Sequence, residues 1–152
     1  MLKLVYDALK IYFKNYNNNN MNSEILELIT DFNNVLLSLS QNIACVCPTS
    51  VIGTNIKDIE KQIKRKENFN KFIDLFCIKV LQYKSEIDSG NEDFFMNKDY
   101  KNDLHDQNED LLDHVLSMKT IWSQLKKGNK EIVIMNMQIL CELSQQYFNK
   151  VI

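Results

Sequence analysis

The sequence has 152 residues, of which 45% are hydrophobic and 25% charged, and its formal net charge is -2. This length suits a single folded domain with its own core. Three Gly and one Pro argue against turn-rich β architectures and Gly-rich phosphate loops, which need many such residues. The small net charge and the single arginine, Arg65, argue against specific nucleic-acid recognition. The composition favours an all-α fold.

The first predicted element is an amphipathic helix over residues 2–16, followed by an Asn-rich linker over 17–22. The apolar side chains at helical spacing, which form a candidate partner-binding face, are Leu2, Val5, Tyr6, Leu9, Tyr12 and Phe13. This face can bind a groove on a partner or pack back on the rest of the chain, and the sequence leaves both open.

Residues 23–152 are predicted to form one helical domain. Its first helix begins at Ser23, a good N-cap, and ends before Pro48, which disfavours helix in the preceding residue. A loop over 49–53 then leads to a shorter helix that Thr54 is expected to cap.

That shorter helix ends in a basic cluster, formed by Lys61, Lys64, Arg65 and Lys66. Positive charge at a helix C-terminus is favourable in itself, so the cluster can be a solvated helix end. It is also a candidate contact for an acidic partner or for a phosphate backbone.

The next helix is predicted over roughly 69–87 and is apolar on most sides, which is typical of a central helix. A polar stretch over 88–110 follows. We expect it to be a surface loop held at its middle by Phe94 and Phe95.

The last two helices are predicted over about 106–127 and 130–151, with Trp122 on the apolar stripe of the first. Gly128 is the expected hinge between them, which predicts a C-terminal αα-hairpin. The whole chain is therefore expected to form a bundle-like domain of five or six helices.

The cysteines and the polar residues give little evidence of a metal site or a catalytic site. One C-x-C pair with no second pair favours four separate reduced thiols over a zinc site. The densest polar cluster lacks the second Glu-x-x-His motif of a di-metal site, so we interpret it as a solvated acidic helix start. It comprises Asp103, His105, Asp106, Glu109, Asp110, Asp113 and His114. We predict no catalytic residue, no metal and no cofactor.

Three stretches, residues 32–63, 71–96 and 121–148, together resemble small helical proteins of unassigned function from nucleo-cytoplasmic large DNA viruses, the mimivirus-like giant viruses especially. The resemblance covers about residues 23–150 and leaves residues 1–22 outside. It implies a location in the host cytoplasm, the virus factory or the virion, and it supplies no catalytic residues. An excess of Asn, Ile and Lys over Ala agrees with the AT-rich coding of such genomes.

The favoured hypothesis is a non-enzymatic, viral protein-interaction module that acts as a subunit or adaptor in a larger assembly. The first alternative is a nucleic-acid-associated packaging or transcription accessory protein. A further alternative is a viral Bcl-2-like regulator of host cell death, although Trp122 lacks the flanking residues of that family's signature. We expect an intracellular location, because no secretory signal is present, and no membrane span, because no apolar run approaches about 18 residues.

Overall fold

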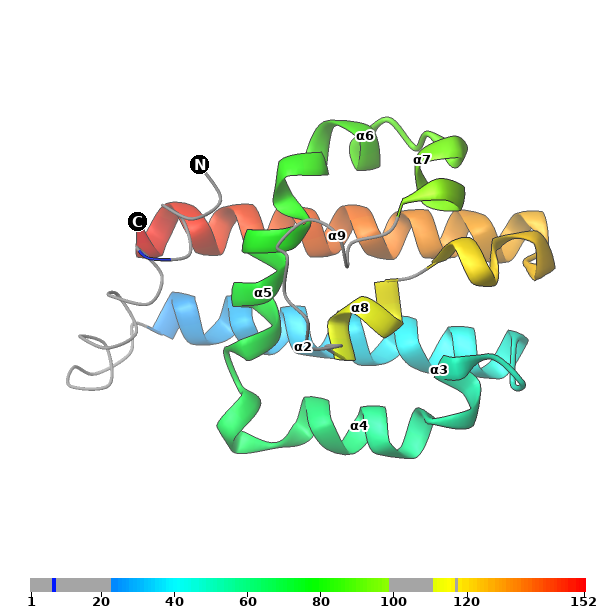
Figure 1. The fold of residues 1–152 in the computed structure, drawn as a ribbon. Coiled ribbons are helices and arrows are strands. Elements are labelled where there is room, and N and C mark those ends of the chain that lie inside the picture. Colours follow the sequence, from blue (N-terminus) through cyan, green and yellow to red (C-terminus); the bar gives the residue numbers. More distant parts are fainter. Residues whose placement is uncertain (1–6, 8–22, 99–110, 117) are drawn as a thin grey trace.

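A computed structural model gives the fold and describes residue 7 and residues 23–98, 111–116 and 118–152 (Figure 1). Across these residues there are eight α-helices and no strand, so the predicted all-α bundle is confirmed. The number of helices is higher than predicted because several expected helices are broken into shorter ones. The predicted helix over 2–16 and the linker over 17–22 lie outside the described residues, Asp7 excepted.

Two long antiparallel helices, α2 (Ser23–Val46) and α9 (Lys127–Val151), form the frame of the bundle (Figure 1). The predicted first helix is confirmed, since its apolar residues recur every three or four positions and are buried. At one end, Lys150 Nζ lies 2.6 Å from Glu24 Oε2 and connects the end of α9 to the beginning of α2. The two helices are thus aligned along their whole length.

Shorter helices pack against this frame. In chain order they are α3 (Val51–Thr54), α4 (Ile56–Lys64), α5 (Lys71–Lys79), α6 (Lys84–Asp88), α7 (Glu92–Asn97) and α8 (Leu111–Leu116), with single 3-10 turns at 66–68, 81–83, 118–120 and 122–124.

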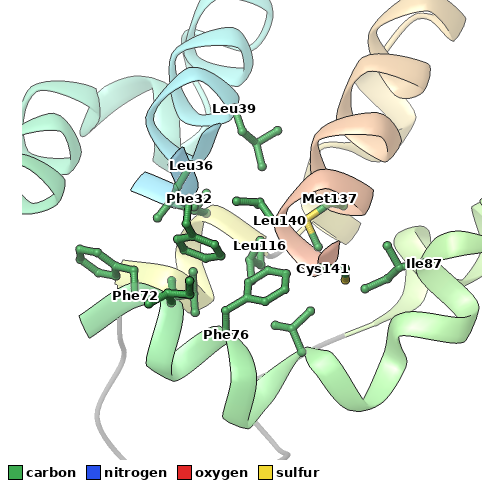
Figure 2. Close-up of a cluster of buried hydrophobic side chains, with 14 of the residues drawn as sticks. Phe32, Leu36, Leu39, Phe72, Phe76, Ile87, Leu116, Met137, Leu140 and Cys141 are labelled. Carbon is green, nitrogen blue, oxygen red and sulfur yellow. The ribbon is translucent and has the colours of Figure 1, made fainter. Parts of the chain in front are cut away.

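The core lies where α2, α5 and α9 meet, and Figure 2 shows their side chains converging. Phe32 of α2 and Phe76 of α5 are fully buried and make an edge-to-face contact with ring centroids 5.3 Å apart. Leu140 and Cys141 of α9 are also fully buried and enter the same cluster. Aromatic pairs in this geometry add to the free energy gained by burial alone.

The expected loop over 49–53 is partly helical. Ser50 caps the new helix α3, because its side chain accepts a hydrogen bond from Gly53 N at 3.1 Å. Thr54 does not cap the helix that follows, α4, whose N-cap is Asn55. Gly53 is required here for space: a Cβ at this position would lie 2.4 Å from the carbonyl oxygen of Cys47. Thr54 is the last residue of α3, and α4 begins at Ile56.

The expected single helix over 69–87 is broken after Lys79. The chain continues through a 3-10 turn over 81–83 into α6. With this break, Val80 just after α5 and Ile87 in α6 are both fully buried. Packing against α9 therefore outweighs the helical periodicity of this segment, which reads as continuous in the sequence.

The polar stretch after residue 88 contains a helix, α7, which Asn91 caps by accepting a hydrogen bond from Asp93 N. Phe95 holds this helix to the bundle as expected. It is buried and stacks on Trp122 with ring centroids 5.6 Å apart, whereas Phe94 is half-buried. The remainder of that stretch, residues 99–110, lies outside the described residues.

The C-terminal region differs most from the prediction. In place of one helix reaching residue 127, α8 ends at Leu116 and two 3-10 turns follow. Gly128 is not a hinge, because it lies in the first turn of α9. The expected hairpin partners do not pair: α8 packs mainly on α3 and α5, and the long antiparallel partner of α9 is α2. Trp122 is 1% exposed, which confirms its predicted place in the core.

Candidate interaction surface

The basic cluster of Lys61, Lys64, Arg65 and Lys66 surrounds the end of α4. Lys61 and Lys64 lie in its last turn, Arg65 is the C-cap, and Lys66 begins the 3-10 turn that follows. All four side chains are exposed. Their placement fits both interpretations made from the sequence, a solvated helix end and a contact for an anionic partner.

The other predicted binding face, from Leu2 to Phe13, lies outside the described residues. The domain nevertheless carries a groove beside the first turns of α2. The groove has a volume of about 410 Å³ between the start of α2 and the end of α9, and it is lined by Glu24, Glu27, Leu28, Asp31, Leu143, Gln146 and Lys150. Three carboxylates against one ammonium make its rim acidic.

An apolar patch lies on α9 and the neighbouring end of α2. Three side chains at helical spacing on α9 are exposed, Ile132 at 40%, Met135 at 52% and Ile139 at 39%. Val46 of α2 is 42% exposed and, with Ile132, lines a small pocket of about 90 Å³. We call Val46, Ile132, Met135 and Ile139 the apolar patch. The three α9 residues recur every three or four positions, a spacing that in sequence is typical of a buried helix face.

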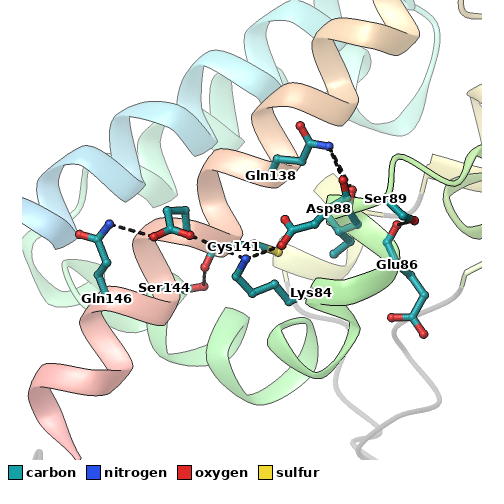
Figure 3. A network of polar contacts seen from close by, with 10 residues as sticks. Lys84, Glu86, Asp88, Ser89, Gln138, Cys141, Ser144 and Gln146 are labelled. Atoms are coloured by element: carbon teal, nitrogen blue, oxygen red, sulfur yellow. Dashed lines mark hydrogen bonds and ion pairs between the residues drawn. The ribbon is translucent and has the colours of Figure 1, made fainter.

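A network of hydrogen bonds and ion pairs connects α6 to α9 (Figure 3). Lys84 contacts both Asp88 of its own helix and Glu142 of α9, the latter at 3.7 Å. Gln146 Nε2 donates to Glu142 Oε1 at 3.1 Å. Gln146 also lines the groove, so the network fixes one wall of it.

Sequence reasoning missed a buried ion pair. Lys79 of α5 and Asp113 of α8 are 2% and 4% exposed, and Lys79 Nζ lies 3.0 and 2.8 Å from the two carboxylate oxygens. Asp113 was expected on a solvated acidic helix start, and that expectation is wrong. Nothing in the sequence distinguishes this aspartate from its acidic neighbours, because its burial depends on how α8 meets α5.

A half-buried carboxyl group, that of Asp74, is held by a tyrosine. Tyr147 of α9, itself fully buried, donates a hydrogen bond to Asp74 Oδ1 at 2.6 Å. Burial raises the pKa of Asp74 from 3.8 to about 8, and the hydrogen bond from Tyr147 offsets only part of this rise. At neutral pH this carboxyl group is therefore largely protonated.

The four cysteines are free thiols, as expected, and only Cys45 is exposed. Burial raises the pKa of Cys141 to about 12 and raises that of Cys77 as well. A thiol with a raised pKa is a poor nucleophile and a poor metal ligand. Cys77 and Cys141 therefore act as core residues.

The polar cluster around residues 103–114 is only partly described, since its members from Asp103 to Asp110 lie outside the described residues. Of the others, Asp113 is bound by Lys79 and His114 is half-buried. Among the described residues, no group of three or more His, Cys, Asp or Glu side chains is placed to hold a metal ion. None of the described helices is both long enough and apolar enough to cross a bilayer.

Comparison with models of known families, with curated proteins and with solved structures finds no match to this chain. The function is therefore inferred from the surfaces of the molecule itself.

Proposed function

We propose that this chain is a non-enzymatic helical interaction module that acts as a subunit or adaptor in a larger macromolecular assembly. The observation that carries the proposal is the apolar patch. Three large side chains of one helix and a fourth from its neighbour are each about 40% or more exposed on one side of the bundle. Contiguous exposed apolar side chains are typical of protein-binding surfaces.

The test compares two variants of the full chain in the cells that produce it. Met135→Lys adds a charge to the middle of the apolar patch, and Asn149→Lys adds the same charge to an exposed position further along α9. After chemical cross-linking, we expect Met135→Lys to lose the partner that the wild type and Asn149→Lys retain. Equal recovery from both variants would reject the patch as the binding surface.

The exposed basic cluster supports a second candidate function, association with nucleic acid. Among the described residues, none of these four exposed cations forms an ion pair, so they can neutralise phosphate groups. Phosphate binding of this kind weakens as the salt concentration increases. We expect DNA or RNA binding at low salt to disappear when Lys61, Lys64, Arg65 and Lys66 are changed to Ala. Absence of binding by the wild-type chain at low salt would remove this alternative.

A further inference from the structure

The acidic groove between α2 and α9 has the chemistry of a site for a cationic amphipathic helix. Its floor is apolar, because Leu28 is buried and Leu143 half-buried, while Glu24, Glu27 and Asp31 are exposed along the rim. Lys150 compensates only Glu24. An occupant with an apolar face and flanking positive charge would bury the floor and pair the remaining carboxylates.

The sequence predicts such a helix immediately before α2. Residues 2–16 combine the apolar stripe from Leu2 to Phe13 with three lysines, at positions 3, 10 and 14, against the single aspartate Asp7. Asp7, the one residue of this segment that the structure describes, has helical backbone geometry and an exposed side chain. At 100° per residue Asp7 lies on the side of the helix opposite Leu9, as expected if the stripe faces inward.

The length of the connection fits this arrangement. The six residues of 17–22 can span at most about 20 Å, which allows the chain to reverse direction next to Ser23, where the groove begins. A helix over 2–16 is about 22 Å long, and the same distance along α9 leads from Lys150 to Met135. A helix lying in the groove therefore covers its floor and extends over Ile139 and Met135, while Val46 and Ile132 stay open.

We propose that residues 2–16 dock as an amphipathic helix in the acidic groove between α2 and α9 of the same chain. The segment is then an integral part of the domain, and its apolar stripe is used within the molecule. This choice decides between the two possibilities that the sequence left open for the stripe. The docking involves contacts within one chain and does not depend on the proposed function.

Disulfide trapping in the full chain tests the docking directly. Cys45, the only exposed native thiol, is first changed to Ser. Cysteine is then introduced at Gln146 in the groove wall and at Leu9 in the apolar stripe. The matched control carries cysteine at Gln146 and at Asp7, which lies on the side of the predicted helix opposite Leu9. Under mild oxidation we expect an intramolecular disulfide for Leu9→Cys and none for Asp7→Cys.

Three outcomes overturn the proposal. A disulfide that links two chains and grows with protein concentration shows that the segment docks on a second copy. Equal trapping from Leu9 and Asp7 shows that the segment has no preferred face. Absence of trapping from Leu9 shows that the stripe does not reach the groove.

A charge-reversal variant tests the contribution of the acidic rim to docking. Glu27→Lys with Asp31→Lys changes two exposed rim residues, so the bundle itself is expected to fold normally. We expect the rate of trapping from Leu9 to fall about five- to tenfold, because two attractive surface pairs become repulsive. The control, Asp58→Lys with Glu131→Lys, makes the same change elsewhere and is expected to leave trapping unchanged. A similar loss in both variants contradicts a specific role for the rim.

Discussion

At the scale of single residues, the ion pair between Lys79 and Asp113 is the clearest departure from an apolar interior. Removing two charges from water is expensive, and their mutual attraction recovers that free energy only when the contact is close. The two contacts of 2.8 and 3.0 Å meet this condition. The pair connects α5 to α8, the short helix that the sequence predicted to be much longer.

We predict that removing one partner of this pair is more harmful than removing both. Lys79→Met leaves Asp113 buried without its lysine, which is expected to lower the free energy of unfolding by about 3–5 kcal/mol. Lys79→Met combined with Asp113→Leu replaces the pair with apolar side chains and is expected to restore most of the loss. Urea denaturation of the three proteins measures both changes.

The control for this comparison is Lys61→Met, which removes an exposed lysine of the basic cluster and is expected to leave stability nearly unchanged. If the double variant is as unstable as Lys79→Met, the loss arises from poor packing and not from burial of Asp113 without its lysine.

Asp74 makes stability depend on pH in the direction opposite to most carboxyl groups. Its pKa is raised on folding to about 8, so between pH 4 and pH 8 the unfolded chain has released a proton that the folded chain retains. The free energy of unfolding therefore falls as pH rises through this range. Hydrogen bonds from Lys150 and Lys130 lower the pKa values of Glu24 and Glu92, so these two carboxylates have the opposite effect on stability.

We predict that Asp74→Asn stabilises the protein at pH 8 and has little effect at pH 4. The amide can still accept the hydrogen bond from Tyr147 and has no charge to bury, so the variant loses the pH dependence caused by Asp74. Thermal denaturation of both proteins across this pH range provides the measurement. A constant difference in melting temperature at every pH would show that ionisation of Asp74 does not control stability.

At the scale of elements, two glycines have opposite roles. Both were expected to lie between helices. Gly53 lies where α3 turns against the end of α2, and a Cβ atom there would lie within 2.6 Å of backbone atoms of Cys47 and Pro48. Gly128 lies in the first turn of α9, where nothing would approach a Cβ atom within 4 Å.

We predict opposite effects of alanine at these two glycines. Gly53→Ala forces the backbone of the α2–α3 corner apart and is expected to lower the free energy of unfolding by about 1–3 kcal/mol. Gly128→Ala adds a better helix former in open space and is expected to raise it by about 0.5–1 kcal/mol. Each variant serves as the control for the other in chemical denaturation. A loss at Gly128 would mean that this glycine is needed as the hinge that the sequence suggested.

At the scale of the whole molecule, local sequence patterns predicted the fold class and the longest elements. The periodicity of α2, the end of that helix before Pro48, and the burial of Trp122 all follow from near neighbours in the chain. The breaks after Lys79 and Leu116 do not, because they depend on how these segments meet α9 and α5. The pairing of α9 with α2 was missed for the same reason, since a short connection after residue 127 favoured the nearer helix.

Of the three candidate surfaces, one could be predicted from sequence and two could not. The basic cluster could be located from sequence because its charges are contiguous along one helix end. The acidic groove and the apolar patch could not, because each is assembled from helices at opposite ends of the chain. Ile132, Met135 and Ile139 have the spacing of core residues, and only the arrangement of the other helices around α9 shows that they remain exposed.

The alignment of α2 with α9 has a consequence for how the chain folds. The contact between Glu24 and Lys150 joins residues 126 positions apart, and the same pairing covers the apolar stripe of α2 along its length. During synthesis, α2 leaves the ribosome long before α9 exists, so its stripe lacks its main cover until α9 has been made. Contacts between such distant segments slow folding and leave apolar surface open to aggregation. We therefore expect the nascent chain to depend on chaperones until α9 has emerged.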